Sequence, residues 1–183
     1  MRTVLMIMML SISLLVNAQE FMGVKVEGTR TQIIEAFKAK GFRVTKNSPE
    51  EKSIIMKGII NSKEIELFAS FTPQSKKCWA FNVYLPEQTS WYDIKKEYND
   101  YLDILIDKYG QPNNKYNFFS SPYYEGDGYE MSALRLEKCT YAAFWDFVSI
   151  QISKFKQVKI HYENATNAAL DDEEKKKINL NNF

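Results

Sequence analysis

Three carboxylates lie close together in the chain beside several aromatic residues. Glu125 and Asp127 flank Gly126, and Glu130 follows shortly after. Paired carboxylates next to aromatic rings are typical of glycoside hydrolases, in which one acid protonates the leaving oxygen. Oxygen ligands at alternating positions are typical of calcium loops. A turn in which Gly126 and Gly128 take unusual backbone angles explains the same residues, and we favour that interpretation.

Other residue types on which catalysis depends are scarce. The single histidine, His161, falls on the polar side of a predicted strand, where we expect a bystander and not a base. Zinc sites need several cysteine and histidine ligands, and the chain has two cysteines far apart. The sequence contains neither a glycine-rich phosphate loop nor a known nucleophile motif. We therefore expect no metal site, no cofactor and no catalytic residue.

The first eighteen residues have the layout of a secretory signal peptide. Arg2 precedes an apolar run from 4 to 16, and small residues, Val16 and Ala18, occupy the positions that signal peptidase reads. The run is shorter than the roughly 20 residues that a membrane-spanning helix needs. We expect cleavage after Ala18, which would leave residues 19–183 in the periplasm or outside the cell without a transmembrane segment.

The chain has two cysteines, Cys78 and Cys139, whose state depends on whether the protein is exported. An even number of cysteines in an exported protein favours a disulfide. A bond between these two would stabilise the fold by about 4 kcal/mol in the chain-entropy description. Two buried free thiols are the alternative, because cysteine packs well as a small hydrophobe. We favour the disulfide.

Length and charge narrow the class of protein. Residues 19–183 suit one domain. The chain has 24 basic and 23 acidic side chains, and removal of Arg2 with the leader balances them. Nothing in this balance favours a nucleic-acid partner or an anionic membrane surface. Aromatic residues make up 14% of the chain and glycines number only 7, which is typical of a packed fold.

Periodicity predicts the elements that position these residues. The predicted helices cover 29–40 and 90–109, and the predicted strands cover 42–45, 54–60, 64–71, 78–85, 129–136, 139–146, 148–154 and 157–162. We expect an α+β fold of two loosely repeated helix-plus-antiparallel-sheet units, 19–88 and 89–163. They would form one domain with the helices packed on one face of the sheet. Residues 164–183 read as a polar C-terminal tail, partly helical.

An aromatic loop is expected between the second helix and the strand at 129. Long structureless loops are uncommon in compact domains unless they bind something. Exposed aromatic residues in such a loop are candidate contacts, whereas folding back over the sheet or forming a short strand is the alternative. The candidate binding residues are Tyr116, Phe118, Phe119, Tyr123, Tyr124 and Asp127.

Two resemblances add to this interpretation. The stretches NAQ, FMGVKVEGT, KCTYAAFW and VKIHYEN resemble those of small exported proteins of the Bacteroidetes that have no assigned activity. The tandem helix-plus-sheet layout is similar to beta-lactamase inhibitor proteins and to outer-membrane assembly lipoproteins of the BamE kind, although no lipid-bearing cysteine follows the leader. The second resemblance implies a protein-binding role.

The leading hypothesis is an exported, non-catalytic binding protein whose partner is another envelope or extracellular protein and whose contact region is 116–127. One alternative is a small hydrolase of envelope polymers that uses Glu125, Asp127 and Glu130. Another is a purely structural envelope protein.

Overall fold

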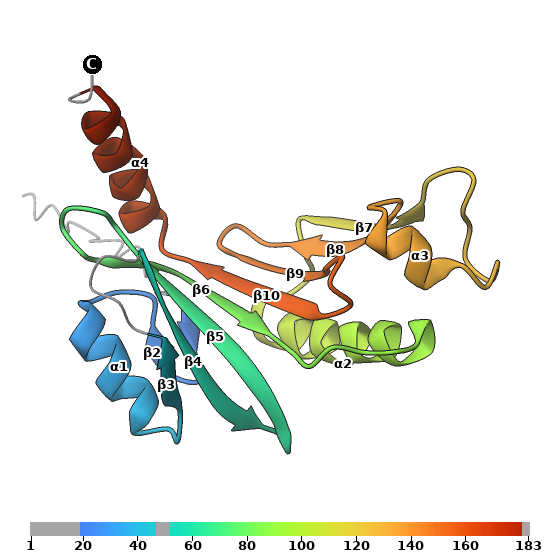
Figure 1. Ribbon diagram of the computed structural model, residues 1–183, viewed down its shortest axis with the longest axis horizontal. Coiled ribbons are helices and arrows are strands. Elements are labelled where there is room, and N and C mark those ends of the chain that lie inside the picture. Colours follow the sequence, from blue (N-terminus) through green and yellow to red (C-terminus); the bar gives the residue numbers. More distant parts are fainter. Residues whose placement is uncertain (1–18, 47–51, 181–183) are drawn as a thin grey trace, which may run out of the picture.

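An antiparallel sheet of eight strands forms the framework of the computed structural model, which describes residues 19–46 and 52–180 (Figure 1). The strands lie in the order β3-β4-β5-β6-β10-β9-β8-β7. Their bounds are Arg43–Lys46 (β3), Ser53–Ile60 (β4), Lys63–Phe71 (β5), Cys78–Tyr84 (β6), Asn114–Phe119 (β7), Cys139–Phe144 (β8), Val148–Ile152 (β9) and Val158–Glu163 (β10). The first and second halves of the chain thus meet where β6 pairs with β10. The predicted signal peptide lies outside the described residues.

The helices lie on both sides of this sheet. In Figure 1, α2 (Trp91–Tyr109) lies below β10, and α1 (Arg30–Lys38) lies beside β3 and β4. The C-terminal α4 (Ala165–Leu180) instead rises from the end of β10 on the other side. A short α3 (Glu130–Arg135) precedes β8, and a small hairpin, β1 (Glu20–Phe21) and β2 (Val24–Lys25), precedes α1. The α+β class is confirmed.

Local sequence signals set the ends of α1 and α2. Before α1, Gln32 N donates to Thr29 Oγ1 at 3.4 Å and Thr29 N donates to Gln32 Oε1 at 2.8 Å, which together form a capping box. Before α2, Asp93 N donates to Ser90 Oγ at 3.1 Å. Gly110 ends α2 with φ at 78°, a conformation that costs glycine little.

The core lies between the sheet and the helices α1 and α2. Phe37 of α1 meets Phe81 of β6 with ring centroids 5.3 Å apart, and Tyr98 of α2 meets Tyr141 of β8 at 5.9 Å. All four side chains are buried. Because successive strand residues point to opposite faces, the intervening residues of these strands form a second face that α1 and α2 do not cover.

The predicted disulfide between Cys78 and Cys139 is wrong, because both thiols are free and buried. Two strands, β10 and β9, separate β6 from β8. Three strand spacings place the cysteines at least about 14 Å apart, whereas bridged Cα atoms lie within about 7 Å. Burial raises the pKa of each thiol to about 12.

The segment 113–136 also differs from expectation. The predicted strand 129–136 is the helix α3, in which the neighbouring residues Ala133 and Leu134 are both buried. Two adjacent buried side chains fit a helix that packs by one face and conflict with strand alternation. The predicted loop 113–128 contains β7, so the strand alternative for this segment is correct. The tail at 164–183 is largely the helix α4.

Candidate functional site

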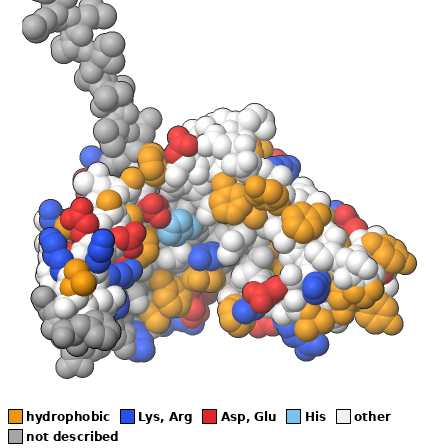
Figure 2. Space-filling view, turned by 90° about the horizontal axis from the view of Figure 1, so that it is seen from above, with side chains coloured by type: hydrophobic (Ala, Val, Ile, Leu, Met, Phe, Trp, Pro, Cys, Tyr) orange, Lys and Arg blue, Asp and Glu red, His pale blue; other side chains and the backbone are white. Residues whose placement is uncertain are grey.

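The sheet face opposite the core is not covered by α1 and α2. Figure 2 looks onto this face from above and shows the histidine, in pale blue, near its middle. Hydrophobic side chains gather over the half to the right of the histidine, where Figure 1 places β7, β8 and α3. We refer to it as the open face.

A half-buried polar cluster occupies the centre of the open face. His161 on β10 lies 2.9 Å from Asn82 on β6, measured from Nδ1 to Oδ1, and its Nε2 lies 3.3 Å from Glu163 Oε2. Burial lowers the pKa of His161 below its ordinary value, although Glu163 partly offsets this. A neutral imidazole has a single N–H, so it donates to one of these two oxygens at a time, and its contact with Asn82 links β10 to β6. The expectation that His161 points to the polar side of its strand is confirmed.

Charged residues cover the open face on the first strands of the sheet. Glu64 on β5 pairs with Arg43 on β3 at 2.5 Å and with Lys57 on β4 at 3.5 Å. Lys57 also pairs with Glu66 at 2.8 Å. We call these four residues the charged end of the sheet. Opposite charges on adjacent strands favour this pairing, and they keep this end polar.

Aromatic residues cover the open face at the other end. Tyr116 and Phe118 on β7 are 45% and 48% exposed, and Phe144 on β8 is 37% exposed. The Tyr116 and Phe144 rings meet edge to face with centroids 6.0 Å apart. We call these three residues the aromatic end of the sheet. Sequence reasoning identified the first two but missed Phe144, whose position beside Tyr116 depends on the register of β7 against β8.

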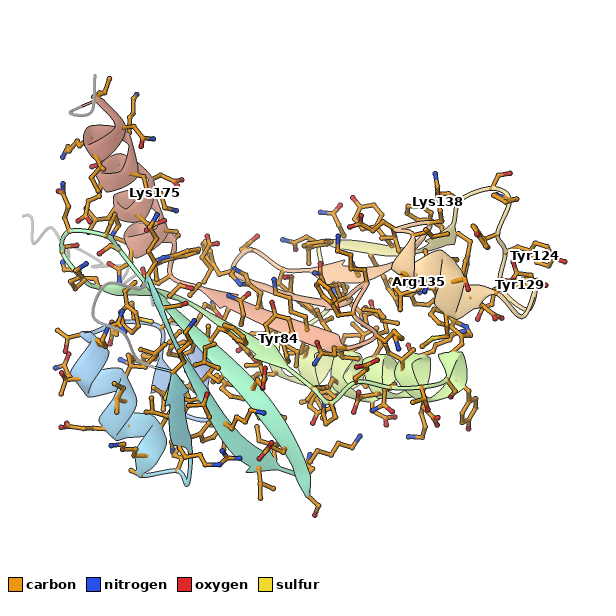
Figure 3. The ribbon with its side chains drawn as sticks, viewed as in Figure 1. Tyr84, Tyr124, Tyr129, Arg135, Lys138 and Lys175 are labelled. Atoms are coloured by element: carbon orange, nitrogen blue, oxygen red, sulfur yellow. The ribbon has the colours of Figure 1, made fainter. Side chains whose placement is uncertain are left out.

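The other predicted contact residues behave in two ways. Phe119 points to the core side, where its ring meets Trp91 at 5.5 Å. Tyr123 is also partly buried against the core. Tyr124, by contrast, is 65% exposed, and Figure 3 shows it with Tyr129 at the tip of the molecule farthest from α4. The loop therefore provides one exposed ring beyond the aromatic end.

The carboxylates of this loop all bond within it or to its neighbours. Glu125 accepts a hydrogen bond from Tyr141 Oη at 3.0 Å and pairs with Lys95 on α2. The hydrogen bond from Lys95 is the main reason that the pKa of Glu125 lies below its ordinary value. The contacts of Glu125 therefore fasten the loop to α2 and β8.

Asp127 and Glu130 bind backbone amides of the same loop. Asp127 accepts from Tyr129 N at 2.7 Å and from Tyr124 N at 3.1 Å. Glu130 accepts from Gly126 N at 2.8 Å. Gly126 and Gly128 have φ of 89° and 77°. These contacts match the turn that was favoured from the sequence.

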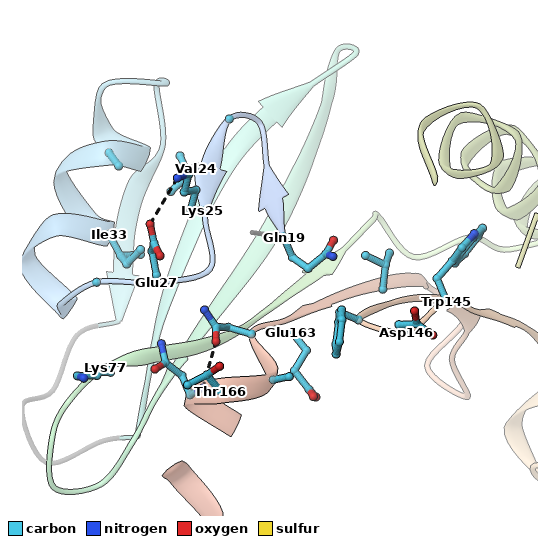
Figure 4. Close-up of a pocket in the computed structure, with 18 of the residues that line it drawn as sticks. Gln19, Val24, Lys25, Glu27, Ile33, Lys77, Trp145, Asp146, Glu163 and Thr166 are labelled. Carbon is cyan, nitrogen blue, oxygen red and sulfur yellow. Dashed lines mark hydrogen bonds and ion pairs between the residues drawn. The ribbon is translucent and has the colours of Figure 1, made fainter. Parts of the chain in front are cut away.

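A broad hollow of about 1670 Å³ lies away from these residues, between the β1–β2 hairpin and the start of α4. Figure 4 shows Trp145, Asp146 and Glu163 on one side of it and Val24, Lys25 and Glu27 on the other. Two of its wall side chains bond to backbone carbonyls nearby: Asn164 donates to Val26 O at 2.8 Å and Trp145 Nε1 donates to Gly110 O at 2.8 Å. The hollow is lined by amides and by both signs of charge.

Within residues 19–46 and 52–180, no three histidine, cysteine or acidic side chains gather as metal ligands would. Over the same residues, every helix is too short or too polar to span a bilayer. Searches against models of protein families, curated proteins and solved structures gave no significant match for this chain.

Proposed function

We propose that this chain is an exported, non-catalytic binding protein whose contact surface is the aromatic end of the sheet. One observation carries the proposal: Tyr116, Phe118 and Phe144 are exposed together on neighbouring strands. The solvated face of an antiparallel sheet ordinarily carries polar side chains. Clustered exposed aromatic residues are typical of protein–protein contacts, in which they provide much of the binding free energy.

The surroundings of the aromatic end suit a protein partner. Two exposed basic side chains lie at this end of the molecule, Arg135 on α3 and Lys138 between α3 and β8. An apolar centre with a polar, solvent-accessible rim is the usual anatomy of a protein interface. A protein partner is also what the resemblance to beta-lactamase inhibitor proteins and BamE-type lipoproteins implies.

The bonding of the polar residues supports a non-catalytic role. A glycoside hydrolase needs two carboxylates that face a substrate across a gap. Here Asp127 and Glu130 accept loop amides and Glu125 pairs with Lys95 and Tyr141. A hydrolase would have to break these contacts to use the three acids.

We also propose that the protein leaves the cytoplasm after cleavage behind Ala18 and that residues 19–88 and 89–163 are two loosely related units. The order of elements supports the second point, because a long helix and its following strands occur twice and the last strands, β6 and β10, pair with each other. N-terminal sequencing of the exported protein should start at Gln19. A sequence that starts at Met1 would contradict cleavage.

The binding proposal is tested by capture from the native envelope with two matched variants. One variant carries Tyr116→Ser, Phe118→Ser and Phe144→Ser. The control carries Tyr92→Ser, which removes an even more exposed ring (75%) from α2. We expect the wild type and the control to retain the same partner and the triple variant to bind it roughly ten-thousandfold more weakly, because three hot-spot rings at about 2 kcal/mol each contribute about 6 kcal/mol. Equal capture by all three would contradict the proposal.

A further inference from the structure

We propose that the outer edge of β7 pairs, antiparallel, with β7 of a second copy of this chain, and that the twofold axis passes beside Asn117. This inference goes beyond the proposed function, because it assigns a role to the backbone edge of the strand and identifies a second copy of the chain as its partner. No described strand pairs with this edge, since β7 is the last strand of the sheet.

The two edges of the sheet differ in how they resist pairing. Natural sheets block their edges with short strands, bulges and charged side chains. The edge strand β3 has four residues, a shift of register between Val44 and Lys46, and the charged Arg43. The edge strand β7 has six residues, an unbroken register with β8 and a single charge, Lys115. Of these features β7 has only the one charge, so it is the less protected of the two edges.

The pattern of hydrogen bonds between β7 and β8 identifies which backbone N–H and C=O groups of β7 point away from the sheet. In an antiparallel pair, alternate residues direct both backbone groups to the partner strand and the residues between them direct both groups away. Ser120 N donates to Lys138 O at 2.7 Å and so continues the ladder past the end of β7. Even-numbered residues therefore bond to β8. The outward groups belong to Lys115, Asn117 and Phe119.

The outward backbone groups of two copies of β7 can pair with each other in one register. With Asn117 opposite Asn117 of the copy, Lys115 lies opposite Phe119 of the copy, and each outward N–H meets a carbonyl. The two Lys115 ammonium groups then lie about 14 Å apart along the strands, beyond the screening length of about 8 Å. An axis beside Lys115 would instead place two like charges directly opposite, which is destabilising.

The same register joins the aromatic side chains. Tyr116 lies opposite Phe118 of the copy at a non-hydrogen-bonded position, where side chains approach most closely. Cross-strand aromatic pairs stabilise such positions. With Phe144 of each copy beside them, the rings form one continuous strip on the open face. Balanced charge after removal of the leader means that two copies do not repel one another at long range.

Cysteine cross-linking tests the register directly. Asn117→Cys places two thiols opposite each other across the axis, whereas the matched control Lys115→Cys, on the same face and edge, places its thiols too far apart to bond. Under mild oxidation we expect a covalent dimer from Asn117→Cys alone. The native cysteines are buried, so the wild type should form no covalent dimer and serves as the negative control. No dimer from Asn117→Cys, or equal dimer from both variants, would overturn the proposal.

Sedimentation of the unmodified chain provides a second test that needs no introduced thiol. We expect a reversible dimer at micromolar concentration, as for small interfaces. Asn117→Pro removes one outward donor from each copy without breaking the bonds to β8, and it should raise the dimer dissociation constant by about tenfold or more. The variant keeps its aromatic rings, so it can still capture a partner protein when it no longer dimerises. Such a result would separate this inference from the proposed function. A wild type that stays monomeric at all concentrations would contradict the inference. This outcome includes the possibility that β7 pairs with a strand of another protein and not with a second copy.

Discussion

The charged end of the sheet contains Arg43, Lys57, Glu64 and Glu66, whereas the aromatic end contains Tyr116, Phe118 and Phe144. Both groups lie on the same open face of one sheet, and each adjoins an edge strand. At the charged end, side chains neutralise one another across strands and the edge is short and bulged. At the aromatic end, the rings stay exposed and the edge is regular. Under the binding proposal, the charged end serves the fold and the aromatic end serves contact.

Thiol reactivity should show the largest effect, because each half of the sheet buries one cysteine. A pKa of about 12 in place of 9.0 for both thiols lowers the thiolate fraction about a thousandfold at neutral pH. A colorimetric thiol reagent should therefore react very slowly with native protein and rapidly in denaturant. Fast reaction of one native thiol would show that its half of the sheet opens in solution.

Gly58 tests whether the β3–β4 region is closely packed. A Cβ at this position would lie 2.6 Å from the Phe42 ring, which is buried. Gly58→Ala should therefore lower the free energy of unfolding by about 2 kcal/mol, as overpacking does. Denaturant unfolding measures this loss. Phe42→Leu in the same chain should recover part of it, and a fully additive double variant would argue against a clash between these residues.

Acidity should weaken the charged end. The hydrogen bond from Arg43 is the main reason that the pKa of Glu64 lies below its ordinary 4.5. A lowered folded-state pKa contributes stability that is present above the unfolded-state value and is lost as the pH falls through the folded-state value. Stability measured from pH 7 down to pH 3 should fall less steeply for Glu64→Gln than for the wild type. Identical slopes would show that this ion pair contributes nothing.

Replacement of the aromatic end should have the smallest effect on stability. Exposed side chains away from the core change the free energy of unfolding by no more than about 0.5 kcal/mol when replaced. We expect the variant with Tyr116→Ser, Phe118→Ser and Phe144→Ser to unfold at nearly the wild-type denaturant concentration. A loss as large as that of Gly58→Ala would mean that the rings serve the fold, which would remove the contrast between the two ends.

The sequence predicted the helices and strands that are long enough to show a clear repeat of buried and exposed residues. Helical spacing located α1 and α2, and alternation located β4, β5, β6, β9 and β10. The strand β7 escaped because five of its six residues are exposed, so burial imposes no alternation on it. The helix α3 escaped because six residues are too few to display a helical period.

The candidate site was predicted in part for a related reason. Tyr116, Phe118 and Tyr124 were identified by composition alone, since exposed aromatic residues are informative wherever they occur. Phe144 joins the first two only through the register of β8 against β7, which a single sequence does not reveal. The cysteine pairing was wrong because it depends on strand order, and β10 and β9 come between the two thiols only in the folded sheet.

Amide hydrogen exchange at the two edges tests the central contrast most directly. The wild type is measured at low and at high protein concentration, and Asn117→Pro serves as the reference that does not pair. We expect the amides of Lys115 and Phe119 to exchange more slowly at high concentration in the wild type only, while those of β3 stay unchanged. Exchange at β7 that is independent of concentration, or protection that arises equally at β3, would contradict the assignment of β7 as the contact edge.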